Sequence, residues 1–234
     1  MTAFVLVHGA WHGGWCWQRL APLLAQGGHA VYAPTLTGLG ERAHLRACVL
    51  DLETHVEDVV GVIESEDLID VVLVGHSLGG IKVLAIAERI ADRVIHLVNV
   101  DGMIPTSGQS IKDMLPGVWE SSRDRAIEAG DEGWVPPPDD WDFGLSRADY
   151  QWARPRLSPD PIKTWETPIV FTPERAGRVP GLFVHCTSGL SPDELVAEQE
   201  TCRKHGWRYE ALPASHDAMI SAPEQLASVL LGIV

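Results

Sequence analysis

The sequence has little basic charge and few cysteines, and both scarcities exclude classes of protein. Only 18 of its 234 residues are Lys or Arg, against 32 Asp or Glu, so the formal net charge is -14. That charge opposes binding to a phosphate backbone, and we expect no nucleic-acid partner. The cysteines are widely spaced among apolar neighbours and form no CxxC pair, which predicts buried, reduced thiols. They are Cys16, Cys48, Cys186 and Cys202.

Long hydrophobic runs and metal-binding motifs are missing as well. No apolar stretch approaches the roughly 18 residues of a membrane span, and no basic region with a long apolar run opens the chain. We therefore expect a cytoplasmic protein without a membrane partner. Because no HExxH motif or carboxylate cluster with ligand spacing occurs, we expect no metal and no other cofactor.

What is present is an alternation of short apolar runs with segments of helical periodicity. Short runs without polar alternation are typical of strands buried on both faces. The expected strands are 4–7, 29–32, 71–74, 94–100, 182–186 and 207–212, and the expected helices are 17–25, 52–66, 78–90, 192–205 and 223–231. This order predicts an α/β fold with a mostly parallel sheet of about six strands and right-handed crossovers.

The alternation stops after Asp101 and resumes near Gly181. The intervening stretch contains Pro116, three consecutive prolines at 136–138 and five of the nine tryptophans, so we expect it to be irregular and partly helical. Loops of this length are uncommon without a function, which favours an inserted cap over a pocket. We therefore divide the chain into a core, 1–101 and 179–234, and a cap, 102–178, whose apolar surface could support a homodimer.

The strongest chemical signal is the GxSxG motif at 75–79, between a predicted strand and a predicted helix. A nucleophile elbow needs this context, because a tight turn lifts the serine off the strand and flanking glycines avoid Cβ clashes. Ser77 is therefore the candidate nucleophile. The backbone N–H of Leu78, at the start of the helix, is a candidate oxyanion donor.

Two further loops could supply the partners that such a serine needs. The HG loop at 8–14 follows the first predicted strand, where this chemistry places its other oxyanion donor, and Ala10 is the candidate. The glycines of that loop could also form an ordinary turn. The loop at 213–219 contains His216, in the late position that the chain order serine, acid, histidine requires. His216 could take the proton of Ser77 and return it to a leaving group.

The remaining histidines and the tryptophans are assigned around this centre. Three histidines are expected to support the site: His8, His12 and His76. Three others are expected at the surface: His44, His55 and His205. Substrate contacts are expected from four residues: Trp11, His76, Trp119 and Trp152. Large aromatics serve both purposes, however, and the tryptophans of the insertion could instead form the core of a small subdomain.

Four stretches of the chain resemble the α/β-hydrolase superfamily, and more narrowly its branch of plant methylesterases and hydroxynitrile lyases with their bacterial esterase relatives. They are FVLVHGAWHGGWCW at 4–17, PTLTGLGER at 34–42, DVVLVGHSLGG at 70–80 and SHDAMISAPEQLA at 215–227. They frame nearly the whole predicted sheet, whereas 102–178 matches little. The resemblance implies the α/β-hydrolase fold, and the first two stretches are similar to esterases that hydrolyse carbamate and pyrethroid pesticides.

Two departures from that branch concern the chemistry. Its lyases have a threonine in the HG loop and a lysine directly after the histidine, where this chain has Gly9 and Asp217. Lyase activity is therefore disfavoured. The branch also usually places its triad aspartate just after the strand that ends here at Cys186, but this chain reads TSG at 187–189.

The acid that would orient His216 must therefore come from elsewhere. Asp101, at the end of predicted strand 94–100, is the best substitute, because some members of the superfamily place the acid there. The alternatives are Asp193 and Glu194, which could instead cap or complement the start of their helix. A site without an acid is the remaining alternative.

Three functions fit these residues. The first is a serine hydrolase that cleaves small apolar or aromatic esters or carbamates through an acyl-enzyme, with a small molecule as its binding partner. The second is a lyase or cyclase that uses the same serine and histidine as a proton relay. The third is a small-molecule binding protein that has lost catalysis, which the intact Ser77 and His216 disfavour.

Overall fold

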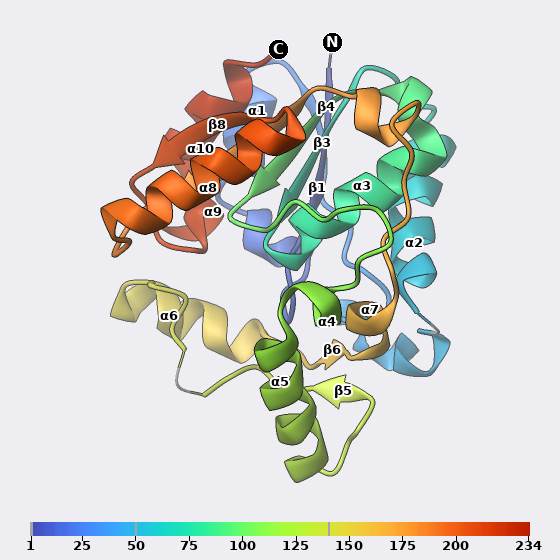
Figure 1. The fold of residues 1–234 in the computed structure, drawn as a ribbon, viewed down its shortest axis with the longest axis vertical. Coiled ribbons are helices and arrows are strands. Elements are labelled where there is room, and N and C mark those ends of the chain that lie inside the picture. The colour runs from blue at the N-terminus through green and yellow to red at the C-terminus, as the bar shows by residue number, and fades with distance from the viewer. Residues whose placement is uncertain (1, 50, 140) are drawn as a thin grey trace.

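The computed structural model describes residues 2–49, 51–139 and 141–234, and its main feature is one parallel sheet of six strands (Figure 1). The strands lie in the order β2-β1-β3-β4-β7-β8, and every neighbouring pair is parallel. Their bounds are β1 Ala3–Val7, β2 Ala30–Tyr32, β3 Val71–His76, β4 Val94–Val100, β7 Gly181–Cys186 and β8 Arg208–Leu212. The predicted α/β fold with about six mostly parallel strands is confirmed.

Helices cover the sheet on both faces. These helices are α1 Ala21–Gln26, α2 Leu52–Ser65, α3 Leu78–Ile90, α8 Pro192–His205 and α10 Pro223–Leu231. Helix α3 packs on β3 and β4 beside α2, whereas α1 packs against α10. Every residue of β1 and β3 is buried, which explains why these strands have no polar alternation. In the described residues no helix is both long and apolar enough to span a membrane.

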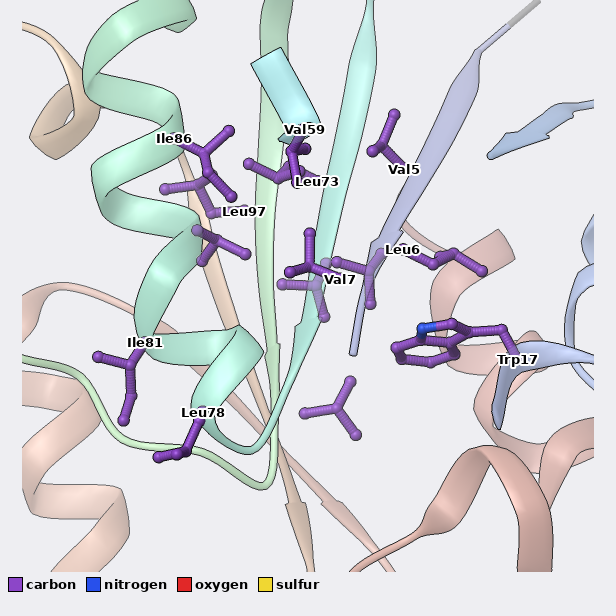
Figure 2. Close-up of a cluster of buried hydrophobic side chains, with 14 of the residues drawn as sticks. Val5, Leu6, Val7, Trp17, Val59, Leu73, Leu78, Ile81, Ile86 and Leu97 are labelled. Atoms are coloured by element: carbon purple, nitrogen blue, oxygen red, sulfur yellow. The ribbon is translucent and has the colours of Figure 1, made fainter. Parts of the chain in front are cut away.

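The core lies between the central strands and the helices that pack on them. Figure 2 shows Leu73 and Leu97 pointing toward Ile86 of α3, and Leu6 pointing toward Trp17. All of these side chains are almost completely buried. The helix expected at 17–25 is instead split into a 3-10 helix η1, Gly14–Trp17, and helix α1, because a proline occupies the first turn of α1.

Residues 102–178 lie between β4 and β7 and contain more regular structure than their composition predicts. Their elements are α4 Ile111–Met114, α5 Pro116–Glu128, β5 Trp134–Val135, α6 Arg147–Ala153, β6 Asp160–Pro161 and α7 Lys163–Glu166. Strands β5 and β6 pair antiparallel. Figure 1 shows α4, α5, α6 and the two short strands together beside the end of the sheet at which β1, β3 and β4 finish.

Shorter elements complete the fold, and one of them corrects an expectation. The 3-10 helices are η2 Gly40–Cys48, η3 Ala91–Arg93, η4 Arg154–Arg156 and η5 Ala176–Arg178, and a short helix α9, Ala218–Ser221, precedes α10. All four cysteines are free, and three are buried as expected. Cys48 is exposed, because it ends η2, a surface helix without a buried residue.

Candidate active site

The turn between β3 and α3 holds Ser77 in a backbone conformation that favours glycine. Its φ is 52° and its ψ is -122°, a conformation that costs a non-glycine residue roughly 1–3 kcal/mol. The flanking glycines are required by close packing. A Cβ on Gly75 would lie 2.3 Å from the carbonyl oxygen of Gly79, and one on Gly79 would lie 2.4 Å from that of Val7. The turn is therefore built to present the serine side chain.

Ala10 and Leu78 lie with Ser77 around one cavity. Leu78 is the first residue of α3, so its N–H has no acceptor inside the helix. Two histidines form hydrogen bonds with the backbone of the loop that carries Ala10. His12 Nδ1 donates to the carbonyl oxygen of Ala10 at 2.6 Å, and His8 Nδ1 donates to that of Gly9 at 2.9 Å.

His8 is neutral at pH 7, because burial lowers its pKa to about 3. Its other ring nitrogen, Nε2, accepts a hydrogen bond from the N–H of Leu36 at 3.1 Å, which only the neutral ring can do. His8 thus connects the HG loop to the PTLTGLGER stretch at 34–42. The supporting role expected of His8 therefore takes the form of hydrogen bonds that link these two stretches of the chain.

His216 and Asp101 form the short contact on which the site depends. His216 Nδ1 and Asp101 Oδ2 are 2.6 Å apart. The second oxygen of Asp101 accepts from the N–H of Cys186 at 2.8 Å, and the Asp101 N–H donates to the carbonyl of Val184 at 2.8 Å. Asp101 has a φ of 52°, so the chain turns sharply where β4 ends and directs the carboxylate at the histidine.

The two alternative acids lie elsewhere. Asp193 and Glu194 are exposed in the first turn of α8. Glu194 forms a capping box with Ser191, since its carboxylate accepts from the Ser191 N–H at 2.8 Å and the Ser191 hydroxyl accepts from the Glu194 N–H. Of the acids considered from the sequence, the structure brings only Asp101 to His216.

A buried charged pair that the sequence did not single out lies behind His216. His12 Nε2 and Asp217 Oδ2 are 3.1 Å apart, and both residues are buried. Burial alone would lower the pKa of His12, but the Asp217 carboxylate outweighs it and raises the pKa above 6.5. Burial would likewise raise the pKa of Asp217, but His12 outweighs it and holds that pKa below its usual value. Both shifts favour the charged form of the pair, and both ring nitrogens of His12 face acceptors, Ala10 and Asp217.

His76 connects this pair to the catalytic histidine candidate. Burial holds the pKa of His76 well below 6.5, so its ring is neutral, and its Nε2 donates to the carbonyl oxygen of His216 at 3.0 Å. The same Nε2 is 3.5 Å from Asp217 Oδ1. His76 thus supports the backbone of His216 from behind.

Three of these residues could in geometry hold a metal ion. The ligand atoms of His76, His216 and Asp217 lie within 4.8 Å of one another. Each side chain already has a protein partner, however: the His216 carbonyl for His76, Asp101 for His216 and His12 for Asp217. We therefore describe the trio as part of a hydrogen-bonded network.

His55 is buried, contrary to the expectation that it lies at the surface. Helix α2 turns it toward Lys82 of α3, whose Nζ is 3.2 Å from His55 Nδ1. His55 Nε2 donates to the carbonyl oxygen of Thr37 at 3.0 Å. Burial, assisted by the Lys82 ammonium, holds the pKa of His55 well below 6.5, so the neutral ring accepts from Lys82. His44 and His205 are exposed, as expected.

A buried aspartate ties residues 102–178 to the HG loop. Asp160 Oδ2 accepts from the N–H of Trp11 at 3.1 Å, and Oδ1 accepts from Trp165 Nε1 at 2.7 Å. The Trp11 indole donates in turn to the carbonyl of Val135 at 3.1 Å. Trp11 has a φ of 64°, so these contacts hold a strained residue directly after Ala10. Nothing in the sequence pattern marked Asp160, which lies 149 positions from Trp11.

The cavity beside Ser77 has a volume of about 370 Å³, within the range of small-molecule sites. Ser77, Ala10, Leu78, Asp101 and His216 all border it. Its remaining lining is mostly apolar: Trp11, Ile81, Gly102, Met103, Ile111, Leu115, Val118, Ser122, Arg125, Pro138, Trp141 and Trp165.

Of the four residues expected to contact substrate, only Trp11 lines this cavity. His76 is buried behind His216, Trp119 packs under the Lys112 ammonium, and Trp152 packs edge-on against Trp15. Two other tryptophans, Trp141 and Trp165, line the cavity instead. Sequence periodicity could not distinguish these positions, because the direction of each indole depends on the packing of short, irregular elements.

Comparisons with known proteins show the family of this chain. Residues 4–229 match the model of the family described as "Alpha/beta hydrolase family". A carbendazim hydrolyzing esterase from Nocardioides sp. (strain SG-4G) is 34% identical, with 100% of both chains covered. A pyrethroid hydrolase from Sphingobium wenxiniae is 29% identical and covers 98% of this chain and 86% of its own. The solved structure of an extracellular alpha/beta-hydrolase from a Paenibacillus species superposes with a TM-score of 0.84 at 23% identity, covering 99% of this chain and 98% of its own.

Proposed function

Because this chain belongs to the alpha/beta hydrolase family, we propose that it is a serine esterase that cleaves small apolar or aromatic esters or carbamates. One observation carries this proposal: Ser77 and a His216 held by Asp101 border the same largely apolar cavity. The relatives named for carbendazim and for pyrethroid hydrolysis support ester or carbamate substrates.

The proposed reaction begins with attack of the Ser77 hydroxyl on the substrate carbonyl. His216 takes the hydroxyl proton on Nε2, because its Nδ1–H is committed to Asp101. The negative charge that develops on the carbonyl oxygen is stabilised by the N–H groups of Ala10 and Leu78. His216 then protonates the departing alcohol, which leaves the acyl or carbamoyl group on Ser77.

Water completes the cycle by the same route in reverse. His216 removes a proton from the water, the resulting hydroxide attacks the acyl carbon, and the proton returns to Ser77 as the acid leaves. Asp101 keeps one tautomer of His216 throughout and stabilises the imidazolium that forms in each half-reaction.

Residues 102–178 act in this proposal as a cap that shapes the substrate cavity. They contribute ten of its lining residues, from Gly102 to Trp165. Their Asp160 also holds the N–H of Trp11, next to the proposed oxyanion donor Ala10. Substrate selection and oxyanion binding are therefore coupled through the insertion.

The test is the hydrolysis of 4-nitrophenyl acetate and an aryl methylcarbamate by the wild type and by Ser77→Ala. We expect Ser77→Ala to lower kcat by roughly 10⁵- to 10⁶-fold, as loss of a serine nucleophile does elsewhere. Ser121→Ala, at an exposed position of α5, is the control and should leave turnover unchanged. Full turnover by Ser77→Ala, or binding of esters without turnover by the wild type, would contradict the proposal.

A further inference from the structure

One wall of the cavity is formed by α4 and α5 and changes from apolar to polar along the chain. Ile111 of α4 and Leu115, which separates the two helices, line the cavity first. Val118, Ser122 and Arg125 follow on α5, spaced by four and three residues. Residues at this spacing lie on one side of a helix. These three residues therefore lie on one side of α5, with Arg125 about 10 Å beyond Val118 along the helix.

The guanidinium of Arg125 has little to neutralise it. Its Nη2 donates to the hydroxyl of Ser122 at 3.1 Å, and Ser122 is completely buried. Its Nε is buried and has no acceptor among the described residues. Within those residues no carboxylate forms an ion pair with it, whereas Arg154 pairs with Asp139 and Arg19 pairs with Asp149.

An unpaired, partly desolvated guanidinium in an apolar cavity favours an anionic ligand. Burying an apolar group against it would leave N–H donors without acceptors, which costs free energy, and a carboxylate accepts from a guanidinium more strongly than a neutral oxygen does. A carboxylate has the planar, two-oxygen geometry that the guanidinium fork matches. The buried Ser122 hydroxyl holds the guanidinium by accepting from Nη2. The attraction is local, because the protein as a whole carries a net charge of -14.

We propose that the preferred substrates are esters or carbamates with an apolar or aromatic body that also bear a carboxylate, which Arg125 binds while Ser122 holds the guanidinium in place. The inference rests on the proposed function, since it concerns the same cavity. Ser77 lies at the turn between β3 and α3, and Arg125 lies on α5 of the insertion. The substrate is therefore held by its reacting carbonyl at one wall and by its carboxylate at another.

The test compares two 4-nitrophenyl esters of equal acyl length, the monoester of adipic acid and the neutral hexanoate. We expect the wild type to hydrolyse the adipate monoester with the higher kcat/KM. Arg125→Met should lower kcat/KM for the adipate monoester about 10- to 100-fold, because it removes a charge-assisted contact. The value for the hexanoate should stay the same or rise. Ser122→Ala should act in the same direction with a smaller effect.

The control is Arg123→Met, two positions away on an exposed part of α5 and outside the cavity lining. It should leave both esters unaffected. If the wild type prefers the hexanoate, or if Arg125→Met changes both esters equally, the inference is wrong even though Ser77-dependent hydrolysis persists. If the wild type cleaves neither ester, or Ser77→Ala still cleaves both, the proposed esterase function fails and the inference fails with it.

Discussion

At the scale of single residues, the position of Asp101 is determined by contacts on both of its oxygens. One oxygen meets His216 Nδ1 at 2.6 Å, and the other accepts from the Cys186 N–H. An aspartate in this left-handed backbone conformation is unusual but tolerated, because Asp and Asn adopt it more readily than most residues. Asn can therefore replace Asp101 without straining the turn further.

Asp101→Asn should keep the fold and lower kcat for ester hydrolysis by roughly 10³- to 10⁴-fold. The Asn oxygen can still accept from Cys186, but its amide N–H would face His216 and favour the wrong tautomer. Steady-state kinetics beside circular dichroism would measure both effects. Asp193→Asn, on the exposed first turn of α8, is the control. An Asp101→Asn enzyme with nearly full turnover, or an equal loss in Asp193→Asn, would assign the acid elsewhere.

The conformation of Ser77 predicts a conflict between stability and activity. Its φ of 52° and ψ of -122° strain any side chain with a Cβ. Ser77→Gly should therefore be inactive yet raise the free energy of unfolding by about 1 kcal/mol relative to Ser77→Ala, which keeps the strain. Urea denaturation of the two variants measures the difference. Equal stabilities would show that the turn is not strained.

Motif residues were predictable at this scale, and residues that act through long-range contacts were not. Ser77 and His216 lie in loops whose place in the order of strands and helices can be predicted from the sequence alone. Asp160 was not singled out, and Asp217 was noted only as a departure from the lyases, because their partners, Trp11 and His12, lie 149 and 205 positions away. His55 was expected at the surface because its partner is Lys82. Lysine is rarely buried, so nothing in the sequence indicated a buried contact between the two residues.

At the scale of elements, the crossing of α3 over β1 depends on a single missing side chain. A Cβ on Gly79 would lie 2.4 Å from the carbonyl oxygen of Val7 and 2.5 Å from that of His8. Both contacts are with backbone oxygen atoms, which cannot move aside as the end of a flexible side chain could. The close approach places the start of α3, and hence Leu78, beside the HG loop.

Gly79→Ala should lower the free energy of unfolding by several kcal/mol and reduce activity, because α3 must move away from β1. Gly61→Ala is the matched control: Gly61 lies inside α2, is exposed, and a Cβ there would meet nothing within 4 Å. That variant should gain roughly 0.5–1 kcal/mol from the better helix propensity of alanine. Thermal unfolding of the two variants measures the contrast, and a mild effect of Gly79→Ala would contradict the close packing.

The elements of the sheet were predictable to within a residue or two, and those of the insertion were not. Buried runs such as 94–100 coincide with their strands, since burial on both faces removes the polar alternation. Helix α5 was missed because its two buried residues are Ser122 and Ala126, so it has no clear apolar stripe. The tryptophans of the insertion likewise pack in directions that no periodicity encodes.

At the scale of the whole molecule, several buried histidines make stability depend on pH. Burial lowers the pKa of His8 to about 3 and holds those of His55 and His76 well below 6.5. Below pH 6.5 the unfolded chain takes up protons that these rings refuse in the folded state, so stability falls as pH falls. His12 acts in the opposite direction, because its pKa is raised and its pairing with Asp217 is retained in acid.

The free energy of unfolding should therefore drop by roughly 2 kcal/mol or more between pH 7 and pH 5, an amount that His8 alone can supply. Urea denaturation at pH 7, 6 and 5 measures the slope. His55→Gln keeps groups that can face Lys82 and Thr37 and should flatten the slope. Exposed His205→Gln should leave it unchanged. Equal stability at pH 7 and pH 5 would mean that these histidines are not buried in their neutral form.

The cavity is a property of the whole chain, because both the sheet and the insertion line it. The proposed chemistry depends on one event, the transfer of a proton from Ser77 to His216. A fluorophosphonate probe reads this event directly, since it reacts with an activated serine and stays attached. Mass spectrometry of the labelled wild type and of His216→Gln is the decisive measurement. We predict one label, on Ser77, that forms much more slowly in His216→Gln; an active wild-type enzyme with no label on Ser77 would contradict the mechanism.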